Sequence, residues 1–180
     1  MPEPQLEMEL DCLDSLPEVA LPPGYRLRTY QEGDAAAWCQ LMAAGIGGEH
    51  REEAFLGSVS GPRGFDPEGL FFLEKDGQTV GSACAVWREG YAEDTGYVHM
   101  VAVDPRHQGR GLGRDLTVAV LYRFRELGMR RAVLQTDDFR LPAIRLYLGL
   151  GFRPRLTHEG HQVRWREVYH KLGRQEEPER

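Results

Sequence analysis

The sequence predicts one mixed α/β domain, and three local patterns support this prediction. Two apolar runs flank Asp76-Gly77, a dipeptide typical of β-hairpin turns, so antiparallel strands are expected on either side of it. Apolar residues recur at every fourth position from Leu112 to Phe124, which predicts an amphipathic helix over 111–127. The short run RAVLQT at 131–136 follows that helix and completes a parallel βαβ crossover. We therefore expect a central mixed, largely antiparallel sheet flanked by helices.

The first third of the chain is expected to hold a lead segment, a strand and two helices. Residues 1–24 are rich in proline and acidic residues and end in Leu-Pro-Pro-Gly, so they are expected to lead into the domain. Alternating residues over 25–30 predict a half-buried strand. Asp34 and Gly45 are suited to cap a helix between them. A second helix is expected over 49–58.

The rest of the chain alternates strands and helices. The hairpin strands are expected within 70–88, a further strand over 95–103, and a helix from Leu141 to about Gly151. Trp165, Val168 and Tyr169 recur at helical spacing, which predicts a C-terminal helix. The expected organisation is a lead segment (1–24), a main α/β domain (25–155), and a C-terminal helix and tail (156–180).

Composition limits the classes of function. A chain of 180 residues with 41% hydrophobic residues fits one domain with one core. Its formal net charge of -6 argues against nonspecific nucleic-acid binding, which requires an excess of basic surface. A neutral or basic small substrate fits better, although an acidic surface also serves solubility alone.

Cysteine usage and the N-terminus indicate where the protein works. Cys12, Cys39 and Cys84 are scattered, without a CxxC pair or a histidine spacing typical of zinc, so we expect a reducing compartment and no metal. The first ten residues lack the positive start and apolar core of a secretory signal. No uninterrupted apolar stretch of about 18 residues occurs, so no membrane partner is expected. These observations favour the cytoplasm.

A glycine-rich loop at 108–113 is the most informative segment. It lies between the strand ending near Val103 and the helix at 111–127, and glycines let backbone amides approach an anion. Three arginines add positive charge around it: Arg106, Arg110 and Arg114. An ordinary turn would also fit three glycines. A dinucleotide loop would follow the first strand, and a Walker loop would contain Gly-Lys-Ser/Thr, so both disagree with the sequence.

Two motifs together resemble the GCN5-related N-acetyltransferase (GNAT) family. Residues 108–113, Gln-Gly-Arg-Gly-Leu-Gly, are similar to the family's pyrophosphate loop, Q/R-x-x-G-x-G/A. Residues 146–152, Leu-Tyr-Leu-Gly-Leu-Gly-Phe, are similar to its LYxxxGF ending. The resemblance covers about residues 25–152 and implies the GNAT fold, in which two neighbouring parallel strands splay apart around the thioester of acetyl-CoA.

The resemblance also implies a cofactor site. Backbone amides of the loop would hold the CoA pyrophosphate, and the main chain of 100–103 would pair with the pantetheine arm. Arg140 departs from the family, which commonly has asparagine there, and could reach a CoA phosphate or a substrate carboxylate, or lie in solvent. The residues implied to contact acetyl-CoA are Val101, Ala102, Val103, Gln108, Gly109, Arg110, Gly111, Leu112, Gly113, Arg114, Thr136 and Arg140.

Two residues are candidates for proton transfer. The resemblance places Tyr147 where many family members have the general acid that protonates the CoA thiolate; its alternative is a packed aromatic. His99 lies on the strand before the loop, where some members have a histidine base; its alternative is a histidine hydrogen-bonded within the sheet. Glu93 and Asp94 are weaker candidates for the base.

The acceptor side would be covered by the first two helices, so Glu49, His50 and Glu53 are candidates for binding the substrate, although a polar helix face explains them as well. The leading hypothesis is an N-acetyltransferase that acts on a primary amine of a small molecule or peptide by direct attack in a ternary complex. The alternative is a noncatalytic acyl-CoA-binding sensor or interaction module. A nicotinamide-dependent oxidoreductase disagrees with the position of the loop. The protein is expected to be a monomer or homodimer.

Overall fold

A computed structural model describes residues 4–174 and separates them into two compact units. The central unit contains Cys12–Ala132. The terminal unit contains the described residues on either side, 4–11 and 133–174.

The central unit is built on an antiparallel sheet in the order β2-β3-β4-β5. Its strands are β2 (Tyr25–Thr29), β3 (Leu70–Lys75), β4 (Gln78–Val86) and β5 (Thr95–Val103). The expected hairpin is present, since β3 and β4 pair across a turn in which Asp76 has a φ of 51° and Gly77 a φ of 77°. These left-handed conformations are the ones that an Asp-Gly turn provides.

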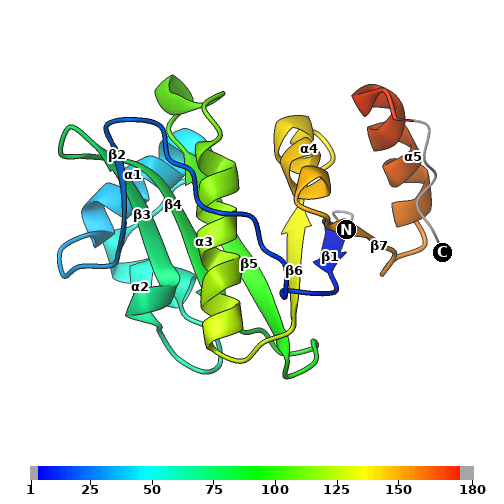
Figure 1. The fold of residues 1–180 in the computed structure, drawn as a ribbon, viewed down its shortest axis with the longest axis horizontal. Helices are drawn as coiled ribbons and strands as arrows, with labels where there is room; N and C mark the ends of the chain where they lie inside the picture. Colours follow the sequence, from blue (N-terminus) through cyan, green and yellow to red (C-terminus); the bar gives the residue numbers. More distant parts are fainter. Residues whose placement is uncertain (1–3, 175–180) are drawn as a thin grey trace. The chain divides into compact units, whose positions relative to one another are not determined.

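Helices cover both faces of this sheet (Figure 1). Gly81 and Gly96 on the strands face Leu116 and Phe124 of the long helix α3. On the other face, Gly45 at the end of α1 approaches Ala102, where an added Cβ would lie 3.2 Å from the Ala102 Cβ. The helical segments of this unit are α1 (Ala35–Gly45), η1 (Glu52–Ala54), α2 (Phe55–Val59), η2 (Pro67–Gly69), η3 (Pro105–His107) and α3 (Leu112–Glu126).

The first helices differ from the prediction in detail. In place of one helix over 49–58, a 3-10 turn, η1, leads into the short α2. Asp34 does precede α1, but its carboxylate pairs with Arg28 at 2.7 Å and accepts from the Gln31 amide, so it ties the helix to β2 and makes no side-chain cap. Gly45 is the last residue of α1, and its missing Cβ permits the close approach to β5.

The terminal unit is built by both ends of the described chain. Its strands have the order β6-β1-β7, with β1 (Leu6–Leu10), β6 (Arg131–Thr136, which begins at the boundary of the central unit) and β7 (Arg153–Arg155). Its helices are α4 (Leu141–Gly149) and α5 (His161–Leu172), the latter being the expected C-terminal helix. Strands β1 and β7 pair antiparallel, with Glu7 opposite Arg155.

Strand β1 was not expected within the lead segment. Leu6 and Met8 are fully buried, whereas Glu7 is held by Arg155 and Gln135. The alternation of apolar and acidic residues is therefore that of a strand whose polar face is ion-paired. Strand β7 was also missed, because three residues are too few to show a period.

The mixed α/β class, with largely antiparallel strands flanked by helices, is confirmed. The splayed parallel pair would involve β5 and β6, which fall mainly in different units, and it stays a prediction. Within residues 4–174, no helix is both long and apolar enough to cross a membrane.

Candidate functional site

The exit of β5 is fixed by a buried aspartate. Asp104 accepts a hydrogen bond from the Arg106 amide at 2.8 Å and pairs with the Arg106 guanidinium at 2.7 Å. The Asp104 amide donates to the Val80 carbonyl on β4 at 2.9 Å. Hydrogen bonds from Arg106 lower the pKa of Asp104 to about 2, so this carboxylate is ionised at neutral pH. Asp104 thus joins the sheet to η3 and sets the direction in which the loop leaves.

The glycine loop then bends twice into left-handed backbone. Gly109 has a φ of 74° and Gly111 a φ of 81°, and Gly111 occupies the N-cap position of α3. No atom lies within 4 Å of a Cβ built on either glycine, so the space beside them is open. Among residues 4–174, no group accepts a hydrogen bond from the amides of 109–113. Open space, free amides and a helix N-terminus are the features that an anion site requires, and the role of the loop in holding a pyrophosphate stays a prediction.

The three arginines of this region have different partners. Arg106 is held by Asp104, and Arg114 donates to the Glu18 carbonyl at 3.1 Å and to Asp115 at 2.8 Å. Arg110 is exposed and pairs with no carboxylate in the described part of the chain. Arg110 is therefore the arginine whose charge is available to a bound anion.

Strand β5 contains a bulge just before this exit. Ser82 pairs with Ala102 and Cys84 with His99, so Met100 and Val101 together face the single residue between Ser82 and Cys84. Met100 has a φ of 52°, a strained conformation for a side chain without a polar group. A bulge interrupts the ladder and redirects backbone groups. Composition gives no signal for such a bulge, and the sequence did not predict it.

His99 lies beside the bulge and is held at both ring nitrogens. Its Nε2 is 3.0 Å from the Ser58 carbonyl, which can only accept, so Nε2 carries the proton. Its Nδ1 is 3.2 Å from an Arg88 guanidinium nitrogen, which can only donate. Burial, followed by the charge of Arg88, lowers the pKa of His99 to about 4. These contacts disfavour His99 as a base, because its lone pair already accepts a hydrogen bond; the catalytic role stays a prediction.

Arg88 was not predicted from the sequence to belong to the site. Its guanidinium carbon lies 3.8 Å from the centre of the Tyr97 ring, in a cation–π contact that holds the group beside His99. The only available signal was its position two residues beyond the end of β4, opposite the start of β5. Arg88 sets the tautomer of His99.

The three acceptor-side candidates do not converge. Glu49 is exposed and pairs with Arg51, and Glu53 is exposed in η1. His50 hydrogen-bonds the Gly47 carbonyl at 3.1 Å and packs edge-on against Trp38. Their local contacts are those of a polar surface with one packed histidine, and a role in acceptor binding stays a prediction.

The remaining candidates belong to the terminal unit. Thr136 is buried at the end of β6. Arg140 stands at the N-cap position of α4 and pairs with Asp137 at 2.9 Å. Its guanidinium charge is therefore partly balanced by a neighbouring carboxylate. Tyr147 is buried on α4, with its ring centre 5.9 Å from that of Phe152. The end of β6 and the start of α4 thus place these residues in one unit, and their predicted roles stay predictions.

Two of the three thiols, those of Cys39 and Cys84, are buried. Burial raises the pKa of the Cys84 thiol to about 12, and burial also raises that of Cys39, so neither is a thiolate at neutral pH. Within residues 4–174, no group of histidine, cysteine and acidic side chains could hold a metal ion.

Comparisons with known proteins point to one family. The sequence model described as "Acetyltransferase (GNAT) family" matches residues 28–152. A mycothiol acetyltransferase of Thermomonospora curvata is 37% identical over 153 residues, which cover 82% of this chain and 50% of that protein. A mycothiol acetyltransferase of Thermobispora bispora is 38% identical over 146 residues, which cover 76% of this chain and 49% of that protein. The chain thus spans about half the length of these relatives.

Solved structures show the same fold. A GCN5-related N-acetyltransferase from Sphaerobacter thermophilus superposes with a TM-score of 0.66 at 23% identity, covering 85% of this chain and 50% of that one. The diaminobutyrate acetyltransferase EctA from Paenibacillus lautus, solved with its substrate and coenzyme A, gives a TM-score of 0.58 at 19% identity, covering 69% of this chain and 73% of that one. Because the matched model spans most of the chain and includes the loop before α3, this protein belongs to the acetyltransferase (GNAT) family, as its sequence predicted.

Proposed function

We propose that this chain is an acetyl-CoA-dependent N-acetyltransferase that acts on a primary amine of a small molecule. The observation that carries the proposal is the open loop before α3, in which the amides of 109–113 find no acceptor within residues 4–174 and the space beside Gly109 and Gly111 is open. Two findings support it: the relatives are named mycothiol acetyltransferases, and EctA binds coenzyme A.

The loop residues fit a pyrophosphate. Amides of Gly109 to Gly113 would donate to its oxygens, and the N-terminus of α3 would add a partial positive charge. Arg110 would supply a full charge from the exposed side. Gln108 donates to the Val103 carbonyl at 3.1 Å and would hold the end of β5 while the pantetheine arm lies along it.

The transfer itself requires little covalent chemistry from the protein. Acetyl-CoA supplies an activated acetyl thioester, and an amine that has lost its proton can attack it directly once both are held in a ternary complex. The bulge at Met100 would aim backbone groups of β5 at the reacting carbonyl. Tyr147 would protonate the departing thiolate, and because the nitrogens of His99 are engaged, the amine proton would leave through water unless Arg88 moves.

The acceptor is the part that the fold leaves open. The names of the relatives put mycothiol-related amines first in an acceptor screen, followed by amino sugars, polyamines and peptide N-termini. The net charge of -6 favours neutral or cationic acceptors over anionic ones. No described contact favours the noncatalytic alternative, so it enters as an outcome of the test.

The first experiment is calorimetric titration of acetyl-CoA into the wild-type protein and Gly111→Asp. The aspartate would place a negative charge in the loop, and we expect binding to fall below detection. Gly128→Asp is the matched control, because Gly128 has a similar φ of 78°, equally open surroundings, and lies at the other end of the same helix.

Binding that Gly111→Asp loses and Gly128→Asp keeps would support the cofactor site. Transfer to any amine in the screen would then support the enzyme, and tight binding with no transfer to any of them would favour the sensor. If the wild-type protein does not bind acetyl-CoA, the proposal is refuted.

A further inference from the structure

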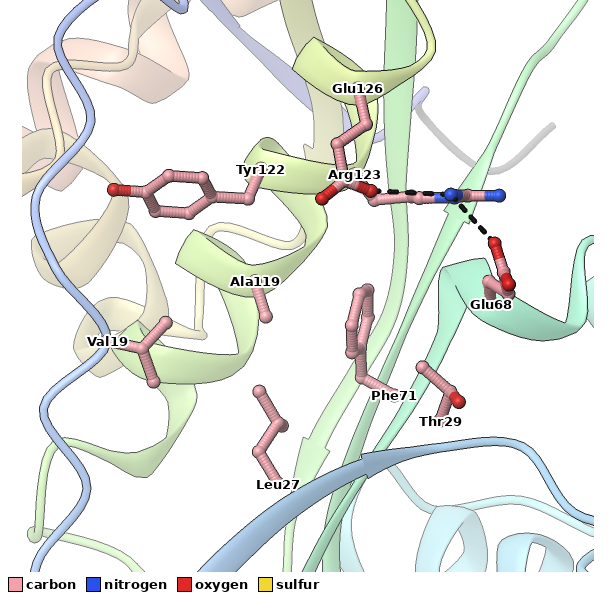
Figure 2. Close-up of a pocket in the computed structure, with 9 residues that line it drawn as sticks. All are labelled: Val19, Leu27, Thr29, Glu68, Phe71, Ala119, Tyr122, Arg123 and Glu126. Carbon is pink, nitrogen blue, oxygen red and sulfur yellow. Dashed lines mark hydrogen bonds and ion pairs between the residues drawn. The ribbon is translucent and has the colours of Figure 1, made fainter.

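A cavity lies in the central unit beneath the C-terminal half of α3, away from the loop at the start of that helix (Figure 2). Its volume is about 390 Å³, within the range of small-molecule sites. Leu27 of β2, Phe71 of β3 and Ala119 of α3 give it an apolar floor. Gly111 and Tyr122 are eleven residues apart on α3, so the loop and the cavity lie roughly 16 Å apart along the helix.

The rim of the cavity is acidic. Asp66 forms a bidentate pair with Arg123, at 2.9 and 3.1 Å, and so neutralises its charge. Glu68 and Glu126 also reach Arg123, at 3.0 and 3.3 Å, but they are 71% and 65% exposed and are left in excess. Figure 2 shows both glutamates at the edge of the cavity beside Arg123, with Phe71 standing below them. Three carboxylates therefore share one guanidinium, and the group carries a net charge of -2. An apolar floor beneath such a rim suits an organic cation.

One wall of the cavity connects to the loop. Val19 lines the cavity and belongs to the segment 12–24, the strap, which runs beside α3 (Figure 1). Of its two neighbours, Glu18 accepts through its carbonyl from Arg114, and Ala20 donates through its amide to Asp115 at 3.1 Å. Both partners lie in the first turn of α3, immediately after the glycine loop. A ligand that displaces Val19 would therefore shift its neighbours Glu18 and Ala20, which are hydrogen-bonded to the first turn of α3.

We propose that this cavity is an effector site for a small organic cation with an apolar body, and that the strap transmits its occupancy to the loop before α3. The volume equals about thirteen water molecules in the liquid, enough for one aromatic ring with a compact ammonium group. The ring would lie on Leu27 and Ala119, and the ammonium group would lie between Phe71 and the two glutamates. The transmission rests on the proposed function, which assigns the loop to acetyl-CoA.

The test uses benzyltrimethylammonium, which has no N–H bond and so cannot accept an acetyl group. Calorimetric titration into the wild-type protein should show binding, and benzyl alcohol and phenylacetate should bind more weakly, in that order. Removing both rim charges in Glu68→Gln/Glu126→Gln should weaken the affinity for the cation about fivefold and leave the affinity for benzyl alcohol unchanged. No heat from the cation, or equal affinities for the three probes, would overturn the site.

Two further variants locate the binding. Glu159→Gln/Glu167→Gln removes the same charge from two exposed glutamates of the terminal unit and should leave the cation affinity unchanged. Ala119→Phe fills the floor and should abolish binding of both the cation and benzyl alcohol, with circular dichroism to confirm that it folds. An equal loss in the two glutamate pairs would show a general effect of net charge and overturn the assignment.

Transmission is measured by titrating acetyl-CoA with and without saturating benzyltrimethylammonium. We expect the dissociation constant of acetyl-CoA to change about fivefold in the wild-type protein and not in Glu68→Gln/Glu126→Gln at the same probe concentration. An unchanged constant in both would overturn the transmission. If the probe binds while acetyl-CoA binds neither protein, the proposed function fails and the cation site stands.

Discussion

The state of His99 yields a prediction that separates a structural histidine from a catalytic one. His99→Gln keeps both hydrogen bonds, because the amide NH₂ can donate to the Ser58 carbonyl and the amide oxygen can accept from Arg88. Glutamine does not titrate. The variant therefore removes the proton equilibrium of His99 while keeping the contacts of its neutral form.

The magnitude follows from the pKa of His99, which is about 4 in the folded protein against 6.5 in the unfolded chain. A depressed histidine pKa means that the unfolded chain binds the proton more tightly, so stability is complete above pH 6.5 and falls as the pH drops toward 4. Between pH 7.5 and pH 5.0 the wild-type protein should lose about 2 kcal/mol more unfolding free energy than His99→Gln.

The assay is denaturation by urea at the two pH values for the wild-type protein, His99→Gln and His158→Gln. His158 is exposed, so its variant controls for the loss of an ordinary histidine. Groups common to all three proteins cancel in the comparison. Equal pH dependence in the wild-type protein and His99→Gln would refute the reasoning. The acetylation rate gives a second readout: a base would make His99→Gln slow and flatten its pH–rate profile, whereas a structural histidine would leave the profile unchanged.

Three further predictions concern the site and the core. Tyr147→Phe should lower the maximal rate of acetyl transfer at least tenfold with unchanged affinity for acetyl-CoA; steady-state kinetics decide, and equal rates would remove the tyrosine from the mechanism. Asp104→Ala removes the acceptor for the Arg106 amide, so it should lower the free energy of unfolding by about 1 kcal/mol. Calorimetry should also show a severalfold weaker affinity for acetyl-CoA. An unchanged affinity would show that the turn does not shape the loop. Gly96→Ala would bring a methyl group within 2.4 Å of the Phe124 ring, so thermal unfolding should show a loss of about 1–3 kcal/mol, and an unchanged midpoint would mean that the helix shifts freely.

Local structure could be predicted from the sequence wherever it depends on residues that are close together along the chain. The Asp76-Gly77 turn, the glycine loop and the apolar stripe of α3 all depend on residues within a few positions of one another, and all three are present. The same holds for the C-terminal helix α5, whose aromatic spacing is complete within two turns.

Features that depend on distant partners were not readable. Gly45 looked like a helix cap, but the approach of Ala102 explains it. The bulge at Met100 arises where the register between β4 and β5 shifts, and the hydrophobic pattern of a single strand does not reveal such a shift. For His99, the strand position was predicted correctly, but its state depends on Arg88 and on a carbonyl at Ser58, 41 residues away. The residue type was predictable, whereas its protonation required the neighbours.

Strand β1 shows the limit most directly, because its partner is supplied by the other end of the chain. The ion pair between Glu7 and Arg155 joins residues 148 positions apart, and β7 offers only three residues for pairing. Five alternating residues have little tendency to form a strand alone, so Leu6–Leu10 becomes one only when Leu6 and Met8 can be buried. The terminal unit therefore cannot be completed before the last strand has formed. The strap that follows β1 then runs to α3, so the residue that lines the cation site, Val19, belongs to a segment held at both of its ends by long-range contacts.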